Sequence, residues 1–484
     1  MTVAAVGIDV GTTGVKALAL APDGAIVGRA EHHYGLSHPR PGWSEQDPED
    51  WWTATQAALA ELAGIEIAGI GLSGQMHGLV ALDGAERVLR PAILWNDQRT
   101  QAQCDEIEQR IGLERLIALT GNRALTGFTA PKLLWMREHE PELYGQIEHV
   151  LLPKDLVRLR LCGERAIDVA DASGTLLFDV GERRFSSEVL AALELPSSWM
   201  PRSLESPEVS GRTPAGVAVA AGSGDCAAAA LGVGVDRPGP VSITLGTSGV
   251  VFAALPAFAA DREARVHAFC HAVPGTWHAM GVMLSAAGSL AWARETFAPG
   301  VAFDVLLREA EAVPAGSQGV LFAPYLSGER TPHADPNARA ALVGLSASHS
   351  RGHVIRAVLE GVAYGLTDSL DLLRELGVEA TVGRVSGGGA RSDLWLRICA
   401  SVMGIPLCRT AADEGSAFGA ALLGGVAGGL FASTSEAVAA CVRVRDEIEP
   451  DPQWTVVYAE DRARFRALYP ALKNLTQVQK EILG

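Results

Sequence analysis

The sequence predicts an α/β protein built from two similar lobes that face each other across a central cleft. The chain has 484 residues, which is more than one hydrophobic core usually organises. The pentapeptide Gly-Thr-Thr-Gly-Val at residues 11–15 recurs as Gly-Thr-Ser-Gly-Val at residues 246–250. Each copy follows one strand-like apolar run and precedes another, so a duplicated lobe explains the repeat better than coincidence does.

The boundary between the lobes is predicted from turn residues. The stretch Gly-Val-Asp-Arg-Pro-Gly-Pro at residues 234–240 has the composition expected of a hinge. We therefore expect an N-terminal lobe over residues 1–235, with the first repeated loop, and a C-terminal lobe over residues 236–484, with the second.

The N-terminal lobe is predicted to begin with paired strands, because short apolar runs alternate there with turns that contain Gly or Pro. Asp47 followed by Pro48 predicts a helix N-terminus, and the helix should continue to residue 62. The strands expected in this region cover residues 6–10, 15–20, 25–27, 65–72 and 78–82.

A later segment, residues 416–435, carries no charge and could be mistaken for a membrane span. It is rich in Gly, Ala and Ser and poor in large apolar side chains. Such a composition favours a closely packed internal helix over a span.

The overall composition narrows the function classes. Hydrophobic residues make up 48% and charged residues 20%, as in globular proteins. The net charge of −16 repels nucleic acid and anionic membrane surfaces, so we expect neither as a partner. The seven cysteines are an odd number without a C-x-x-C pair, which argues against a disulfide framework. The N-terminus has no basic region typical of a signal peptide, so a cytoplasmic location is expected.

The two repeated loops are predicted to bind phosphate. Glycine tolerates positive φ and has no side chain to hold a ligand away, so successive N–H groups can converge on an anion. An ordinary hairpin turn explains either loop alone, whereas two copies in two lobes favour a shared ligand. The candidate phosphate-binding residues are Gly11, Thr12, Thr13 and Lys16 in the first loop, and Gly246, Thr247 and Ser248 in the second.

A third glycine cluster, Ser-Gly-Gly-Gly-Ala-Arg-Ser at residues 386–392, follows a predicted strand over 381–385 and precedes a predicted helix over 394–403. A strand–glycine–helix junction suits a nucleotide because the helix N-terminus presents unpaired N–H groups. A tight turn is the alternative. The candidate nucleotide-binding residues are Gly388, Gly389 and Ser392. The sequence has neither a Walker A motif nor a G-x-G-x-x-G fingerprint, which disfavours P-loop enzymes and nicotinamide dehydrogenases.

These motifs resemble those of the FGGY carbohydrate kinases, within the actin, Hsp70 and sugar kinase superfamily and its ribonuclease H-like fold. The resemblance spans nearly the whole chain. It implies ATP as phosphate donor, Mg²⁺ as metal, a sugar as acceptor, and a homodimer. The segments that carry it are residues 7–14, 245–249 and 387–392, with the longer signatures at 127–139, 340–345 and 353–360.

Within this family, Gly-Gln-Met-His-Gly at residues 74–78 and Trp-Ser-Glu-Gln-Asp-Pro at residues 43–48 resemble the xylulokinase subgroup. The resemblance implies phosphorylation of D-xylulose at its C5 hydroxyl, with Asp225 as the catalytic base that also contacts the sugar. The next residue is Cys226, where many relatives carry an amide. A thiol hydrogen-bonds a sugar hydroxyl poorly, so this difference affects the expected sugar preference. The sugar site implied by the resemblance contains Met76, His77, Trp95, Asn96 and Asp97. Read alone, Met76 is also compatible with a core residue and His77 with a structural one.

Asp225 also makes chemical sense from its local sequence. It lies on a glycine-containing turn before the small residues 226–230, which suit the start of a helix. Phosphoryl transfer to an alcohol needs a carboxylate to take the hydroxyl proton. A helix cap is the alternative role for such an aspartate. Asp9, at the end of the first predicted strand, is the candidate for holding Mg²⁺ through water.

Other functions remain open at this point. A kinase for ribulose, gluconate or glycerol would share the same motifs, as would an ATP-binding sensor or chaperone of the superfamily. Hsp70-like proteins add a peptide-binding domain, which no segment after residue 450 resembles. The segment His-Ala-Phe-Cys-His at residues 267–271 alternates small and aromatic residues and is predicted to be a strand rather than a transition-metal site.

Overall fold

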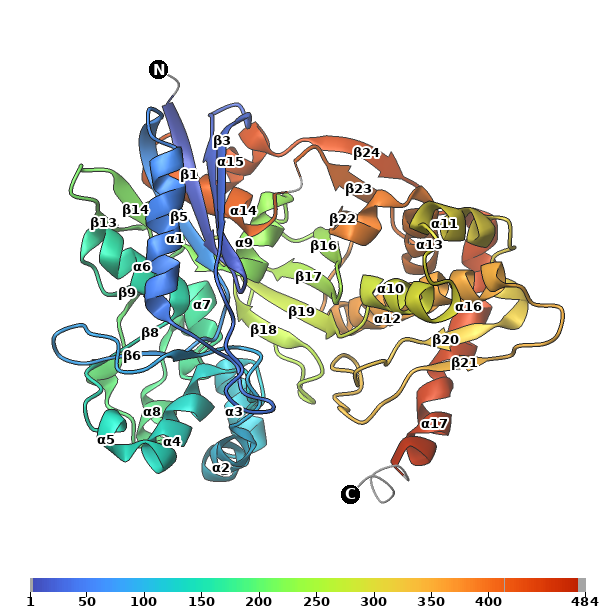
Figure 1. Ribbon diagram of the computed structural model, residues 1–484, viewed down its shortest axis with the longest axis horizontal. Helices are drawn as coiled ribbons and strands as arrows, with labels where there is room; N and C mark the ends of the chain where they lie inside the picture. Colours follow the sequence, from blue (N-terminus) through green and yellow to red (C-terminus); the bar gives the residue numbers. More distant parts are fainter. Residues whose placement is uncertain (1–2, 413, 478–484) are drawn as a thin grey trace.

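The computed structural model describes residues 3–412 and 414–477, and it folds into two lobes, each built on a seven-stranded sheet (Figure 1). In the N-terminal sheet, the central strand β1 pairs antiparallel with β2 on one side and parallel with β5 on the other. The strands of this sheet are β13 (Val209–Arg212), β14 (Ala218–Ala220), β5 (Glu66–Gly74), β1 (Val3–Val10), β2 (Gly14–Leu20) and β3 (Ile26–His33), with β15 (Ser223–Gly224) added beside β5.

The C-terminal sheet repeats this pattern. Its central strand β16 pairs antiparallel with β17 and parallel with β22. In sheet order its strands are β18 (His267–Cys270), β19 (Trp277–Met283), β17 (Gly249–Leu255), β16 (Pro240–Leu245), β22 (Val382–Ser386), β23 (Leu407–Thr410) and β24 (Val444–Ile448).

The duplicated lobe predicted from the repeated pentapeptide is confirmed by these two sheets. The order β3-β2-β1-β5-β14 in one lobe matches β19-β17-β16-β22-β23 in the other, with the same parallel and antiparallel pairings. The two repeated loops therefore occupy the same position, as the first hairpin turn of each sheet. The predicted strand at residues 267–271 is also confirmed, as β18.

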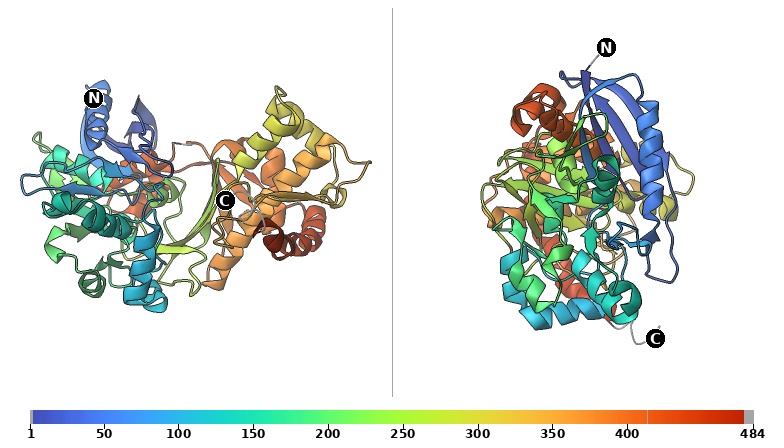
Figure 2. Two further views of the ribbon diagram at one scale, coloured as in Figure 1. Left: turned by 60° about the horizontal axis from the view of Figure 1, so that its bottom comes forward. Right: turned by 90° about the vertical axis from the view of Figure 1, so that its left-hand side faces the viewer.

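Helices cover both sheets. The predicted first helix is α1 (Pro48–Glu61), and the Asp47 side chain accepts a hydrogen bond from the Glu49 N–H at its start, as expected of an N-cap. In the C-terminal lobe the long helix α12 (Arg351–Glu375) is buried over most of its length and packs against β19, β20 and β17 (Figure 2). The other helices of the N-terminal half are α2 (Gln101–Ile111), α3 (Leu113–Thr120), α4 (Thr129–His139), α5 (Pro141–Tyr144), α6 (Pro153–Cys162), α7 (Val169–Ser173), α8 (Ser187–Ala192) and α9 (Asp225–Gly232). Those of the C-terminal half are α10 (Ala287–Phe297), α11 (Phe303–Glu311), α13 (Asp393–Met403), α14 (Ser416–Ala427), α15 (Thr434–Cys441), α16 (Pro452–Arg466) and α17 (Leu468–Gln477).

Short strands complete the fold. They pair as β4 (Glu45–Gln46) with β7 (Ala92–Ile93), β6 (Val80–Leu82) with β8 (His149–Leu151), β9 (Ala166–Asp168) with β12 (Arg202–Leu204), β10 (Phe178–Asp179) with β11 (Arg184–Phe185), and β20 (Leu321–Ala323) with β21 (Ala341–Val343).

Helix α14 packs on the N-terminal sheet although it comes late in the sequence (Figure 1). Its close contacts require glycine: a Cβ added to Gly71 of β5 would lie 1.8 Å from the Ala420 carbonyl oxygen. Where α14 faces α9, a Cβ added to Gly419 would lie 1.8 Å from the Ala228 carbonyl oxygen. The predicted internal helix is thus present, but it ends at Ala427 and α15 follows as a separate helix. Within the described ranges no helix is long and apolar enough to cross a membrane.

The lobe boundary near residue 235 stays a prediction. All strands of the first sheet precede residue 235 and all strands of the second begin at residue 240 or later. The chain returns to the N-terminal lobe at α14, however, so the two lobes are not two uninterrupted stretches of sequence.

Hairpin β18–β19 joins the lobes. The Asn122 side chain donates to the Ala268 carbonyl oxygen at 3.0 Å, and its Oδ1 lies 2.7 Å from His267 Nδ1. Nearby, the Cys270 N–H donates to Ser173 Oγ at 3.0 Å. The C-terminal sheet is therefore anchored directly on α7 of the N-terminal lobe.

Candidate active site

Two carboxylates meet at one edge of the N-terminal sheet. Strands β1, β5 and β15 run parallel, and their register aligns Asp9 with Ser73 and Ser73 with Ser223. Asp9 near the end of β1 and Asp225 directly after β15 therefore lie close together. Burial raises the pKa of Asp225 to about 7, and the negative charge of Asp9 adds to this shift. A carboxyl group with this pKa can exchange a proton near neutral pH.

Asp225 is the first residue of α9, and the helix is capped by Gly224 without a side-chain hydrogen bond. Asp225 is therefore not the N-cap of α9, which was the alternative role considered from the sequence. The pKa of Asp9 is also shifted: burial raises it, while the nearby hydroxyls of Ser416 and Ser73 and the charge of Lys16 oppose the shift. Its Oδ1 atom is buried and has no hydrogen-bond partner in the described part of the chain.

Met76 and His77 come directly beside this edge. Met76 packs on the turn before Asp225, since a Cβ on Gly224 would lie 2.8 Å from Met76 Cγ. His77 Nδ1 lies 2.7 Å from the Gly174 carbonyl oxygen and donates to it. Burial lowers the pKa of His77 to about 3, so the ring is neutral and Nε2 is left as an acceptor.

The backbone of His77 is fixed as well. It has a φ of 68°, and its carbonyl oxygen accepts from Lys132 Nζ at 2.8 Å and from Thr129 Oγ1 at 3.1 Å. The buried Lys132 was not assigned a role from the sequence, although it lies within the signature at residues 127–139. The signature at residues 127–139 indicated the family, but it did not indicate that Lys132 donates to the His77 carbonyl oxygen.

The three predicted wall residues differ in their surroundings. Trp95 is 42% exposed, and its indole N–H donates to Thr12 Oγ1 at 3.1 Å. Asn96 Oδ1 is buried without a hydrogen-bond partner among the residues described. Asp97 is fully buried, accepts from the Ser44 N–H at 2.7 Å and pairs with Arg99 at 2.7 Å. Trp95 and Asn96 can therefore meet a ligand, while Asp97 holds the loop that carries them.

The first phosphate loop is a tight turn in which the Gly11 N–H donates to the Gly14 carbonyl oxygen at 3.0 Å. Thr13 is exposed at its tip. Lys16, in contrast, forms an ion pair with Glu414, which Arg29 also contacts at 2.7 Å. The positive charge expected from Lys16 is thus shared with an acid from the segment that precedes α14.

The second phosphate loop lies beside the third glycine cluster. Strands β16 and β22 align Thr244 with Ser386, so residues 246–248 and 387–392 extend from neighbouring strand ends. A Cβ on Gly387 would lie 2.8 Å from the Leu245 carbonyl oxygen, which explains the glycine there. Thr247 and Ser248 are exposed, and a Cβ on Gly388 would meet nothing within 4 Å, so this surface is open to a ligand.

The predicted order of strand, glycine cluster and helix is present after residue 381, as β22 followed by α13. A 3₁₀ turn, η3 (Gly388–Arg391), separates β22 from α13. Gly389 is buried in this turn, where a Cβ would lie 2.9 Å from Leu245 Cβ. Ser392 Oγ accepts from the Trp395 N–H at 3.2 Å and caps α13, because Ser is a strong N-cap residue. Its hydroxyl is therefore engaged in ordering the helix.

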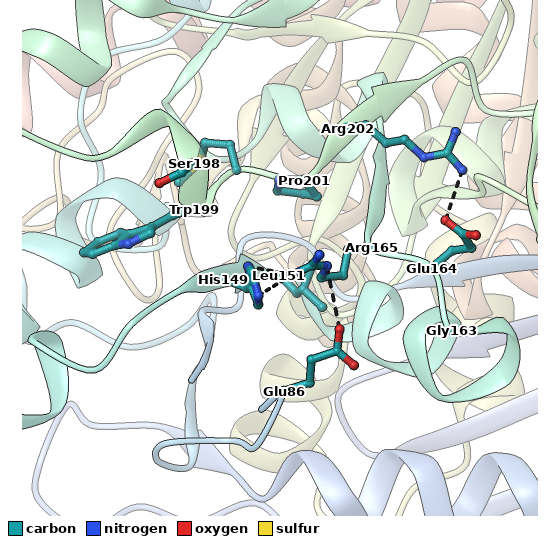
Figure 3. Close-up of a pocket in the computed structure, with 11 residues that line it drawn as sticks. Glu86, His149, Leu151, Gly163, Glu164, Arg165, Ser198, Trp199, Pro201 and Arg202 are labelled. Atoms are coloured by element: carbon teal, nitrogen blue, oxygen red, sulfur yellow. Dashed lines mark hydrogen bonds and ion pairs between the residues drawn. The ribbon is translucent and has the colours of Figure 1, made fainter. Parts of the chain in front are cut away.

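A pocket of about 350 Å³ lies apart from these residues (Figure 3). It is lined by His149, Arg165, Trp199 and Arg202, together with Glu86 and Glu164. The arginines form ion pairs with the glutamates at 3.7 and 3.4 Å, and all four side chains are more than two-fifths exposed. None of the site residues predicted from the sequence lines this pocket.

The sequence and the structure were compared with those of known proteins, and both comparisons find two-domain carbohydrate kinases. Residues 4–232 match the N-terminal domain and residues 241–428 the C-terminal domain of the FGGY family of carbohydrate kinases. A xylulose kinase of Escherichia coli K12 is 42% identical over 97% of this chain and 99% of that protein, and one of Bacillus subtilis 168 is 37% identical over 99% and 97%. The crystal structure of a "xyloylose kinase" from Brucella ovis superposes with a TM-score of 0.91 at 42% identity, covering 98% of this chain and all of that one. The two matching domains together cover most of the chain, which therefore belongs to the FGGY family of carbohydrate kinases.

Proposed function

We propose that this protein transfers the γ-phosphoryl group of ATP to the C5 hydroxyl of D-xylulose, giving D-xylulose 5-phosphate and ADP. The observation that carries the proposal is the position of Asp225, beside Asp9 and against Met76, with a pKa near 7. The names of the similar proteins support xylulose as the acceptor among sugars.

Asp225 acts as the general base. Its carboxylate takes the proton of the C5 hydroxyl while the hydroxyl oxygen forms a bond to the γ-phosphorus and the bond to the β-phosphate oxygen breaks. Because its pKa is about 7, a substantial fraction of Asp225 is ionised at neutral pH and remains basic enough to accept the proton.

The sugar would be held by acceptors of fixed orientation. His77 presents Nε2 because Nδ1 donates to Gly174, and Asn96 offers an Oδ1 atom that lacks a partner among the described residues. Met76 provides an apolar surface. A site built from such groups discriminates between epimers, because a wrong hydroxyl leaves a buried polar atom unpaired, at about 1–3 kcal/mol.

The nucleotide would lie between the lobes. Its phosphates would contact the first loop through Gly11, Thr12 and Thr13 and the second through Gly246, Thr247 and Ser248. Gly388 and Gly389 would form the surface under the adenosine, next to Ser392 at the start of α13. Lys16 contributes a charge that Glu414 partly offsets.

The residues present are compatible with Mg²⁺. Asp9 Oδ1 is a buried anionic oxygen without a hydrogen-bond partner in the described structure, and Asp225 adds a second carboxylate nearby. No group of three or more His, Cys, Asp or Glu side chains suited to a metal occurs in the residues described. Mg²⁺ commonly keeps several waters and binds substrate phosphates, so one or two carboxylates suffice. When bound, the ion would neutralise charge on the phosphates.

The homodimer and the cytoplasmic location implied earlier also remain proposals. The first rests on the family resemblance alone, and light scattering of the purified protein measures it directly. The second is supported by seven cysteines that form no disulfide in the structure.

The experiment that tests the reaction is ADP release measured with a panel of acceptors. We expect the highest kcat/KM with D-xylulose, and D-ribulose, which differs only at C3, as a nearby but poorer substrate. L-ribulose, gluconate and glycerol complete the panel. If D-ribulose, L-ribulose, gluconate or glycerol gives a higher kcat/KM than D-xylulose, the substrate assignment is wrong while the kinase assignment stands. If no acceptor stimulates ADP release, the kinase function itself is refuted.

A further inference from the structure

A buried glutamine connects the sugar residues to the first phosphate loop. Gln75 lies between the end of β5 and Met76, and only 1% of its surface is exposed. Its backbone N–H donates to the Val10 carbonyl oxygen at 2.9 Å, and its side-chain Nε2 donates to the Gly11 carbonyl oxygen at 3.3 Å. Its Oε1 accepts from Thr12 Oγ1 at 3.4 Å. One residue thus contacts both the strand end that carries Asp9 and the loop that follows it.

A second buried glutamine completes the network. Gln46 on β4 is 2% exposed, and its Nε2 donates to the Thr12 carbonyl oxygen at 2.6 Å and to the Gly35 carbonyl oxygen at 3.0 Å. Its Oε1 accepts from Gln75 Nε2 at 2.8 Å and from the Trp51 indole N–H at 3.0 Å.

The orientation of both amides is determined by these partners. Rotating the Gln46 amide by half a turn would point its Nε2 at the N–H of Trp51 and at Gln75 Nε2, and its Oε1 at two carbonyl oxygens. The same exchange in Gln75 would bring oxygen against the Gly11 carbonyl oxygen. The network therefore has one arrangement. An apolar side chain of the same shape at either position could form none of these hydrogen bonds.

Trp95, another residue of the predicted sugar site, contacts the same loop. The Trp95 indole N–H donates to Thr12 Oγ1 at 3.1 Å, and that hydroxyl in turn donates to Gln75. The Thr12 hydroxyl therefore connects Gln75, the residue before Met76, with Trp95 of the predicted sugar site.

We propose that Gln46 and Gln75 are positioning residues that couple sugar binding to the geometry of the first phosphate loop. Sugar contacts on Met76 and His77 bear directly on the backbone of Gln75, whose amide fixes the positions of Gly11 and Thr12. The loop reaches its productive position when the sugar is in place, which limits ATP hydrolysis by water in the absence of sugar. This inference rests on the proposed sugar kinase function.

The test uses Gln75→Met and Gln46→Met, because Met matches the length of Gln but cannot form the network. For each purified variant, the rate of ADP formation is measured without sugar, where water is the acceptor, and with saturating D-xylulose. The rate with sugar divided by the rate without sugar gives the coupling. We expect this ratio to fall about tenfold, since each lost hydrogen bond in a transition-state network changes a rate by roughly that factor. A purely stabilising role would lower the melting temperature but leave the ratio unchanged.

The double variant and a matched control sharpen the result. Because the two glutamines share one hydrogen bond, the double variant should lose less than the product of the single effects. Gln103→Met is the control: Gln103 is also 2% exposed and hydrogen-bonded, to Glu138 at 2.7 Å, but it lies on α2 outside this network. Its ratio should match that of the wild type.

The outcomes separate this inference from the proposed function. If D-xylulose stimulates the wild type and both single variants keep its ratio, the coupling is refuted and the kinase function stands. If Gln75→Met does not fold, Gln46→Met decides by the same criterion. If no sugar stimulates the wild type, both the kinase function and the coupling are refuted.

Discussion

At the scale of single residues, the reactive properties arise from neighbours that are remote in sequence. Asp225 acquires its raised pKa from burial and from Asp9, which lies more than two hundred residues earlier in the chain. The sequence predicted the carboxylate and its turn, but not its pKa. Likewise, it predicted His77 but not the hydrogen bond to Gly174 that fixes its tautomer.

The role of Asp225 leads to a prediction on activity and pH. Asp225→Asn should reduce kcat by on the order of 10²–10⁴, because the amide cannot accept the hydroxyl proton, while ATP still binds. In the wild type, activity should fall as the pH drops below about 7, since protonation removes the base. The measurement is the pH profile of kcat/KM, with nucleotide binding by calorimetry as the control. Near-normal turnover of the variant would exclude Asp225 as the base.

At the scale of elements, turn chemistry and small residues determine most of the arrangement. Alternating apolar runs and glycine turns predicted the hairpins, and the repeated pentapeptide predicted that the lobes share a topology. The uncharged segment from residue 416 predicted a packed helix but not its partner. That partner is the N-terminal sheet, because only the glycines of β1 and β5 allow α14 to approach so closely.

Close packing of α14 predicts a stability effect. In Gly419→Ala the new methyl group would lie 1.8 Å from the Ala228 carbonyl oxygen, so α14 or α9 must shift. We expect a loss of about 1–3 kcal/mol in the free energy of unfolding, as is typical for overpacking. Chemical denaturation measures it. Gly35→Ala is the control, because a Cβ there meets nothing within 4 Å, and equal stability of the two variants would contradict the prediction.

At the scale of the whole molecule, the proposed function requires both lobes to act on one pair of substrates, ATP and the sugar. One of the two repeated loops belongs to each sheet, and Asp9 and Asp225, for which we propose metal-binding and catalytic roles, lie at an edge of the N-terminal sheet. We expect the lobes to approach each other so that ATP contacts both loops. The chain also passes between the lobes near residues 235–240 and between α15 and β24, and we expect these connections to absorb such a movement.

Lobe closure can be measured directly. Small-angle scattering should give a smaller radius of gyration with D-xylulose and a non-hydrolysable ATP analogue together than with either alone, because ligands bridging the lobes stabilise the closed form. Calorimetry under the same conditions confirms that both ligands are bound. An unchanged radius with both sites occupied would rule out closure as part of the cycle.

The sequence by itself determined the fold class, the duplicated lobes and the identity of the motif residues. It could do so because turns, caps and apolar periodicity act over a few neighbouring positions, and because the motifs are local. Only the tertiary structure decided that Lys16 pairs with Glu414, that Asp97 is held by Arg99 and Ser44, and that α14 covers the first sheet. The pairing of Lys16 and the placement of α14 join segments about 400 residues apart, and whether such groups meet depends on how whole elements pack rather than on the residues beside them. The same packing decides which of the predicted polar groups remain free to bind a substrate.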